Sequence, residues 1–326
     1  MRVLVTGGAG YVGSVVVEEL VASGADRVVV LDDVSKGHEL AVIAAARLVR
    51  GDVGDAALVS RLCREERLDS AIHLAASSLV GESVLAPGKY YENNFVKGLA
   101  LLEGLLAAGV RRLIFSSTAA VYGDAAGSPI TEEFPTEPTN PYGETKLAFE
   151  RALAWYLRAH GLEYISLRYF NAAGATVRNG EQHDPETHLI PLLLAAARGA
   201  LPSVTIFGDD YPTPDGTCLR DYIHVSDLAR AHVRALAEVD RHAGRAFNLG
   251  CGGGFSVKQV IDVARQVTGK SIPTVLGRRR QGDVAILVAS SARAHSALGW
   301  RPEQGDLSMI VEDAWRWRLL HPDGYR

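Results

Sequence analysis

Tyr142 and Lys146 stand four residues apart and form a pair that could move a proton. They follow Asn140 and Pro141, which suit the N-cap and the first position of a helix, so both side chains would lie on one helical face. A phenol with a pKa of about 10 is a poor base at neutral pH, but a nearby ammonium and a helix N-terminus both favour the phenolate. Taken alone, such a pair is more often an ordinary surface contact.

A hydroxyl group precedes this pair along the chain. Thr118 follows an apolar run that reads as a strand, and the carboxyl ends of parallel strands are where α/β sheets bind ligands. Thr118 could therefore share a substrate oxygen with Tyr142. A single Ser or Thr at a strand end is usually only a turn residue, so this prediction depends on the combination of motifs.

A glycine-rich loop supplies the third motif. Gly7, Gly8, Gly10 and Gly13 follow a strand and open a helix, and the dinucleotide-binding pattern fits whether it begins at Gly7 or at Gly8. The glycines would let the backbone approach a pyrophosphate at the positive end of the helix. Asp32, about 20 residues beyond the loop, would accept hydrogen bonds from the adenosine ribose and repel a 2′-phosphate. These residues predict NAD, not NADP.

Strands and helices alternate through the first half of the chain, which is typical of a doubly wound parallel sheet of the Rossmann type. We expect strands at residues 3–5, 27–31, 47–49, 71–74, 112–115 and 164–167, and helices at 11–23, 55–66, 87–108 and 141–160. Shorter helices are expected at 188–197 and 225–237. The prediction is an α/β protein with an NAD-binding domain at 1–170 and a smaller C-terminal α/β substrate domain at 171–326. A later strand near 246–250 would rejoin the main sheet.

The composition is that of an ordinary globular enzyme. The 326 residues carry a formal net charge of −4, with no extended basic segment to bind nucleic acid. The three cysteines share no metal or disulfide spacing, and the ten histidines form neither an HExxH motif nor a Cys–His cluster, so no metal site is expected. The chain begins with an apolar strand, and no apolar run is long enough to cross a bilayer. We therefore expect a cytoplasmic protein that meets neither membrane nor nucleic acid.

The order of these motifs resembles the extended short-chain dehydrogenase/reductases and, within them, the UDP-glucose 4-epimerases. Similar stretches run nearly end to end. They lie at residues 5–11, 80–83, 90–94, 168–171, 206–212, 215–216, 220–225, 247–250 and 299–300, and residues 209–225 are especially characteristic.

The resemblance implies site residues position by position. Cofactor contacts are implied for Tyr11, Val12, Asp32, Asp33, Val34, Ser35, Lys36, Gly37, Asp52, Val53, Leu74, Ala75, Ala76, Ser77, Ser78, Asn94 and Phe170, besides the glycine loop, Tyr142 and Lys146. Contacts with the UDP moiety are implied for Asn171, His188, Leu189, Phe207, Arg220, Arg280 and Asp283. The arginines also suit a diphosphate by their own chemistry, because guanidinium groups pair with phosphates in a bidentate manner.

The implied reaction is the interconversion of UDP-glucose and UDP-galactose. Tyr142 would take the proton from the sugar 4-hydroxyl while hydride passes to NAD and returns to the opposite face. Thr118 would bond the reacting oxygen, and Lys146 would tune the tyrosine. In this family helices equivalent to 87–108 and 141–160 form a dimer interface, so a homodimer is expected. Their extra apolar residues (Leu99, Leu102, Leu106, Leu153 and Trp155) could equally belong to the core.

Three rival functions share parts of this pattern. A nucleotide-sugar 4,6-dehydratase needs an Asp-Glu pair where this chain has Ala119 and Ala120. A nucleotide-sensing binding protein commonly lacks the tyrosine or the lysine, and both are present. A 4-epimerase for UDP-N-acetylglucosamine, UDP-xylose or UDP-glucuronate stays open. Leu287 lies where a tyrosine excludes N-acetyl sugars and a small residue admits them, and leucine is intermediate. Ser78 replaces a lysine found in some members.

Overall fold

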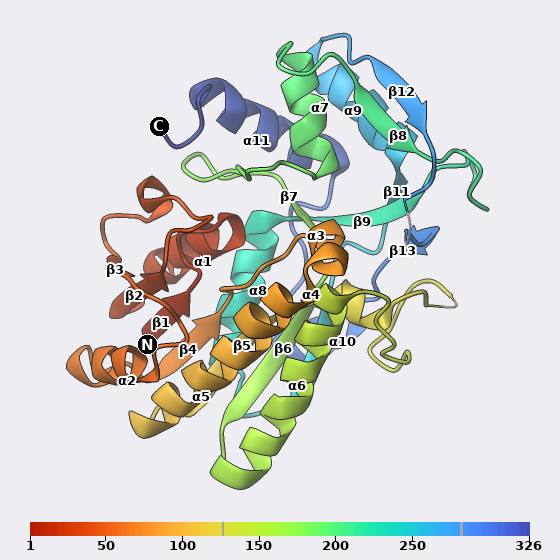
Figure 1. The fold of residues 1–326 in the computed structure, drawn as a ribbon. Coiled ribbons are helices and arrows are strands. Elements are labelled where there is room, and N and C mark those ends of the chain that lie inside the picture. The colour runs from red at the N-terminus through yellow and green to blue at the C-terminus, as the bar shows by residue number, and fades with distance from the viewer. Residues whose placement is uncertain (126, 281–282) are drawn as a thin grey trace.

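A seven-stranded parallel sheet forms the centre of the larger region of the molecule (Figure 1). The computed structural model describes residues 1–125, 127–280 and 283–326. The strand order is β10-β6-β5-β4-β1-β2-β3. The strands are β1 (Arg2–Thr6), β2 (Arg27–Asp32), β3 (Arg47–Arg50), β4 (Ser70–His73), β5 (Arg112–Thr118), β6 (Glu163–Tyr169) and β10 (Arg245–Leu249). The predicted doubly wound α/β fold is confirmed.

Helices cover both faces of this sheet, which explains why its strands are nearly all apolar. In β1, Val3 and Val5 belong to one core and Leu4 to the other, as the alternation of a strand requires. The first core is closed by α1 (Tyr11–Ala22), α8 (Val225–Ala237) and α10 (Ala292–Leu298), and the second by α2 (Ala56–Glu65), α5 (Lys97–Ala107) and α6 (Pro141–His160).

A smaller region lies at one end of the sheet (Figure 1). It contains a four-stranded sheet of β7 (Asn171–Ala173), β9 (Leu219–His224), β11 (Gly254–Ser256) and β13 (Ile286–Leu287), and a two-stranded sheet of β8 (Val204–Phe207) and β12 (Thr274–Gly277). A third core is closed by α7 (Leu189–Ala197), α9 (Val257–Thr268) and α11 (Leu307–Leu320). The domain boundary at residue 170 stays a prediction, and both β10 and α8 follow it in the chain yet pack on the main sheet.

The single helix predicted at residues 87–108 is wrong in detail. Short helices α3 (Val80–Leu85) and α4 (Pro87–Tyr90) lead into a π-helical segment, Tyr91–Val96, before α5 begins. A π-helical segment inserts an extra residue into the turn and is frequent at functional sites. Hydrophobic periodicity carries no signal for it. Two 3-10 turns, Glu39–Ala41 and Ala119–Tyr122, complete the elements.

None of the helices in the described ranges is both long enough and apolar enough to span a lipid bilayer.

Candidate functional site

The glycine loop between β1 and α1 is shaped to let a diphosphate approach the backbone. Gly7 has φ +73°, and a Cβ there would lie 2.5 Å from the Ala75 backbone nitrogen. A Cβ on Gly13 would lie 2.0 Å from the Gly7 carbonyl oxygen. Gly10 is the N-cap of α1 in an extended conformation and offers no side chain. The first turn of α1 therefore presents backbone N–H groups at a helix N-terminus, an arrangement that binds phosphate.

Asp32 fastens this loop to the loop that follows β2. Its Oδ2 accepts a hydrogen bond from the Ala9 nitrogen at 2.9 Å, and its Oδ1 accepts one from the Val34 nitrogen at 2.8 Å. Burial raises the pKa of Asp32, while these two N–H donors lower it. Val34 adopts a left-handed backbone with φ 58°, a conformation that is a genuine outlier for a β-branched residue. Such strain is found at sites where the surrounding structure fixes the backbone for a ligand.

The loop after β4 is held by Asn94, which lies in the π-helical segment. The Ser77 nitrogen donates to Asn94 Oδ1 at 2.8 Å, and Asn94 Nδ2 donates to the Ser77 carbonyl at 3.0 Å and to Thr145 Oγ1 at 3.2 Å. Asn94 is buried, so one amide joins the predicted cofactor loop, residues 74–78, to the helix that bears Tyr142 and Lys146. Asp52 accepts from Lys97 Nζ at 2.5 Å, and Val53 lies in the second core.

Thr118, Tyr142 and Lys146 come together where β5 ends and α6 begins. Asn140 caps α6 through a hydrogen bond from the Gly143 nitrogen to Asn140 Oδ1 at 2.9 Å, which sets Tyr142 in the first turn. Lys146 Nζ lies 6.0 Å from the centre of the Tyr142 ring. The Thr118 hydroxyl accepts from the Ala120 nitrogen at 3.1 Å, and Thr118 is also close enough to lower the pKa of Tyr142.

Electrostatics at this triad depend on burial. Lys146 is 3% exposed, and its ammonium donates to the Ser116 carbonyl at 2.8 Å. Burial lowers the pKa of Lys146 to about 7, and the Glu150 carboxylate opposes this shift. Burial also raises the pKa of Tyr142, opposed by Thr118. A cationic ligand beside the phenol would favour the phenolate, because a nearby opposite charge stabilises the ionised form.

Behind Lys146 lies a buried ion pair that sequence reasoning missed. Arg168 of β6 donates to both carboxylate oxygens of Glu150, with Nε 3.0 Å from Oε1, and Ser117 also donates to Glu150. Arg168 additionally donates to the Tyr122 hydroxyl at 2.9 Å. The family stretch at 168–171 contained the arginine, but its partner on α6 has no motif of its own. The Glu150 carboxylate is the charged group one helical turn beyond Lys146.

The residues predicted to hold UDP lie in the smaller region. Arg220 NH1 donates to the Leu219 and Val284 carbonyls at 3.0 and 2.8 Å, and its NH2 lies 3.3 Å from Asp283 Oδ1. The Arg280 guanidinium carbon stacks 4.0 Å from the centre of the Phe207 ring. Two cations are therefore held in fixed positions, and an aromatic face beside one of them suits a base or a ribose.

Other predicted positions are placed less directly. Asn171 Nδ2 donates to the Asp221 carbonyl at 3.0 Å, and Leu189 begins α7. Phe170 and Leu287 each pack against a small core that includes Tyr122. The His188 imidazole faces Glu181 and Glu186, a contact that no sequence motif predicted. The assignment of these residues to ligands stays a prediction.

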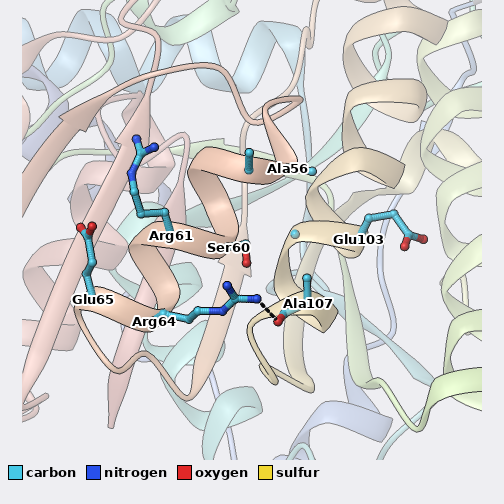
Figure 2. Close-up of a pocket in the computed structure, with 9 residues that line it drawn as sticks. Ala56, Ser60, Arg61, Arg64, Glu65, Glu103 and Ala107 are labelled. Atoms are coloured by element: carbon cyan, nitrogen blue, oxygen red, sulfur yellow. Dashed lines mark hydrogen bonds between the residues drawn. The ribbon is translucent and has the colours of Figure 1, made fainter.

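A pocket of about 730 Å³ lies away from these residues, between α2 and α5 (Figure 2). It is lined by Ala56, Ala57, Ser60, Arg61, Arg64, Glu65, Glu103, Gly104 and Ala107, and none of these is a predicted site residue. Figure 2 shows Arg64 reaching the Ala107 carbonyl, with NH2 2.6 Å from the oxygen. The pocket is therefore not the predicted nucleotide site.

Comparison with known proteins agrees with this geometry. A family model described as the NAD dependent epimerase/dehydratase family matches residues 3–250. The UDP-glucose 4-epimerase of Halalkalibacterium halodurans is 51% identical over 100% of this chain and 98% of its own length. A crystal structure of a UDP-glucose 4-epimerase superimposes with a TM-score of 0.97 at 48% identity, covering 100% of both chains.

A solved structure also carries the two ligands that the site was predicted to hold. The UDP-glucose 4-epimerase of Bifidobacterium longum, in complex with NAD+ and UDP, matches with a TM-score of 0.93 at 38% identity, over 99% of this chain and 100% of its own. The predicted resemblance is thereby confirmed. By the family model and by relatives that match over its full length, this chain belongs to the NAD-dependent epimerase/dehydratase family.

Proposed function

We propose that this protein is an NAD-dependent 4-epimerase that interconverts UDP-glucose and UDP-galactose. The observation that carries the proposal is the Thr118–Tyr142–Lys146 triad, placed where β5 ends and tied by Asn94 to the dinucleotide loops. The same activity is printed for the relative from Halalkalibacterium halodurans, which matches along the whole chain. Ala119 and Ala120 supply no acid or base, so this chain's own residues do not support a dehydratase.

In the proposed mechanism Tyr142 acts as the base at the sugar 4-hydroxyl. Bound NAD would supply the hydride acceptor and donor at the sugar C4. Thr118 bonds the reacting oxygen, and Lys146 stabilises the phenolate through its positive charge. On return, Tyr142 gives the proton back to the oxygen at C4. Arg220, Arg280 and Phe207 hold the UDP, so the sugar alone turns over in the pocket.

NAD contacts are assigned to three loops that the structure brings to one edge of the sheet. They are the glycine loop with Tyr11 and Val12, the residues from Asp32 to Gly37, and the residues from Leu74 to Ser78. The close approach of Gly7 to the Ala75 backbone and of Gly13 to the Gly7 carbonyl supports this assignment, because a larger residue at either glycine would force apart the tight strand–loop–helix turn that the dinucleotide motif needs. Phe170, Asp52 and Val53 complete the set by resemblance.

The protein is proposed to act as a homodimer through α5, α6 and the segment before them. Leu102 and Leu153 are buried within the chain and belong to its own core. In contrast, Trp155 is 66% exposed, and Val84, Leu85 and Val96 are also exposed. An apolar surface of this kind on neighbouring helices supports a contact with a second copy.

The decisive experiment incubates purified protein with UDP-galactose and no added cofactor, and follows the sugar anomeric signals by NMR. Formation of UDP-glucose, abolished by Tyr142→Phe, is the expected result. No conversion by the wild type, even with NAD added, would contradict the glucose/galactose assignment. Parallel runs with UDP-N-acetylgalactosamine and UDP-pentoses would then identify a different 4-epimerase.

A further inference from the structure

Four metal-ligating side chains converge in the segment that leads into α7. Glu181, His183, Glu186 and His188 each offer one donor atom, and the four donor atoms lie within 4.8 Å of one another. His183 Nδ1 is 3.2 Å from Glu181 Oε1 and 3.7 Å from Glu186 Oε2. His188 Nδ1 is 2.7 Å from Glu181 Oε1 and 3.3 Å from Glu186 Oε1.

The His–Glu distances are of the size that a tetrahedral metal requires between neighbouring ligands. Zinc binds imidazole nitrogen and carboxylate oxygen at about 2.0–2.2 Å, so the edges of its ligand tetrahedron are about 3.4 Å long. Three of the four His–Glu separations lie within a few tenths of an ångström of that value, with Glu186 facing His183 through Oε2 and His188 through Oε1. The fourth is a hydrogen-bond length that a bound ion would open slightly. Two carboxylates and two neutral imidazoles would balance the charge of a divalent ion.

One buried nitrogen of the cluster, His183 Nδ1, makes no well-directed hydrogen bond among the described residues, although two carboxylates lie nearby. Glu181 is buried as well, with a side chain that is 8% exposed. A buried polar atom of this kind normally has a partner, and a metal ion among the four side chains would provide it.

The cluster lies between the smaller region and the dinucleotide loops. Lys36 Nζ donates to the Asp184 carbonyl at 2.7 Å, and the His183 ring meets the Tyr11 ring edge-on at 6.4 Å. Arg318 of α11 donates to the Glu181 carbonyl at 3.0 Å. His188 is the N-cap residue of α7. An ion here would therefore fix the segment 181–188, which contacts Tyr11 and Lys36 on one side and leads into α7 on the other.

We propose that Glu181, His183, Glu186 and His188 form a structural site for a divalent transition-metal ion, with Zn²⁺ the ion that suits this ligand set. Mixed imidazole and carboxylate ligands in a closed four-coordinate arrangement favour Zn²⁺ over Mg²⁺ or Ca²⁺, which take six or more oxygens. The expectation from sequence that no metal site exists rested on HExxH and Cys–His motifs. The spacing Glu-x-His-x-x-Glu-x-His lies outside both.

The site is tested on untagged, full-length protein that retains its cofactor, so that a purification tag cannot contribute ligands. The protein is stripped with a chelator, titrated with Zn²⁺, and its bound metal is measured by mass spectrometry after gel filtration. We expect one Zn²⁺ per chain and a rise in Tm on loading. His183→Gln should weaken Zn²⁺ binding by roughly 100-fold or more, because even losing an outer-shell partner commonly costs 10–100-fold. The matched control His160→Gln, an exposed histidine at the end of α6, should bind as the wild type does.

A second measurement needs no variant and so does not depend on whether His183→Gln folds. Co²⁺ added to the stripped wild type should give the intense visible absorption of a tetrahedral site, and Zn²⁺ should displace it. Failure of the wild type to bind stoichiometric Zn²⁺ and to show this spectrum would overturn the proposal and leave the cluster as ion pairs only. Equal binding by the wild type and a folded His183→Gln variant would also overturn it. Both readouts are independent of epimerase activity.

Discussion

Three glycine-to-alanine substitutions separate the cost of a steric clash in the dinucleotide loop from the cost of a left-handed backbone. A Cβ on Gly13 would lie 2.0 Å from the Gly7 carbonyl oxygen, although Gly13 has no positive φ. A Cβ on Gly24, at the far end of α1, would meet nothing within 4 Å, although its φ is +80°. Gly7 combines both demands, with φ +73° and a Cβ position 2.5 Å from the Ala75 nitrogen.

The expected magnitudes follow from these two causes. A left-handed backbone costs a residue with a Cβ about 1–2 kcal/mol, so Gly24→Ala should lower the free energy of unfolding by that amount. Overpacking costs about 1–3 kcal/mol, which is the expectation for Gly13→Ala, and the two costs together predict about 2–5 kcal/mol for Gly7→Ala. Urea denaturation of the cofactor-free protein measures all three.

The three variants should rank differently in NAD affinity than in stability. The clash at Gly13 is with backbone, so it is relieved only by moving the loop away from the pyrophosphate position. NAD binding must then reverse that movement and restore the overpacked loop, which costs about 1–3 kcal/mol. This energy corresponds to a loss of roughly fivefold to a hundredfold in affinity. Gly24→Ala should keep the wild-type affinity, because the αL strain lies at the other end of α1. Isothermal titration with NAD is the assay. If Gly13→Ala bound NAD as tightly as the wild type, the assignment of this loop to the diphosphate would be refuted.

Three further predictions concern α6 and the sugar pocket. Burial lowers the pKa of Lys146 to about 7, so the folded chain holds one proton fewer than the unfolded chain between about pH 7 and 10.4. The cofactor-free protein should therefore gain stability relative to Lys146→Met as pH rises through this window. If urea unfolding gave parallel stability–pH curves for the two proteins, the burial argument would be contradicted. Glu150→Gln leaves Arg168 buried without its charged partner and should lower the free energy of unfolding by about 3–5 kcal/mol. The control Glu144→Gln removes a carboxylate 3.9 Å from Arg151 near the surface and should cost at most about 0.5 kcal/mol. Equal losses of unfolding free energy in urea would be inconsistent with the buried pair. Leu287 packs against the same small core as Phe170. If it also faces the sugar, Leu287→Ala should raise kcat/KM for UDP-N-acetylgalactosamine relative to UDP-galactose, and Leu287→Tyr should lower it. A ratio unchanged by both substitutions would remove Leu287 from the proposed sugar pocket.

The sequence predicted those parts of the molecule that depend on local backbone chemistry. Gly7 and Gly13 predicted a strand–loop–helix unit because only glycine fits these two positions. Asn140 and Pro141 predicted the start of α6 because both residues suit a helix N-terminus. The alternating apolar runs predicted the parallel sheet for the same reason, since strands covered on both faces leave no polar side.

The parts that were missed depend on contacts between distant segments. The π-helical turn places Asn94 against Ser77 and Thr145, 17 and 51 residues away in the chain. Glu150 looks like one more charge on a helix until β6 brings Arg168 against it. The Glu181–His188 cluster is local in sequence, but its spacing matches neither HExxH nor a Cys–His motif, and only the path of the backbone shows that the four donor atoms converge.

The buried pair of Glu150 and Arg168 also joins α6, the helix that bears Tyr142 and Lys146, to the strand that carries Leu287. Arg168 donates to Tyr122, whose hydroxyl donates to Asn248 Oδ1 at 2.7 Å. Asn248 Nδ2 then donates to the Ile130 carbonyl at 3.0 Å, and the Ile130 nitrogen donates to the Val288 carbonyl at 2.8 Å. A pair of apolar residues in place of Glu150 and Arg168 could preserve stability, since replacing a buried ion pair by well-packed hydrophobes is often neutral. It would remove the directional bonds that fix Tyr122 and Asn248, and with them the position of Leu287 relative to Lys146. The polar network therefore fixes the position of β13 relative to α6, because hydrogen bonds are directional and apolar packing is not.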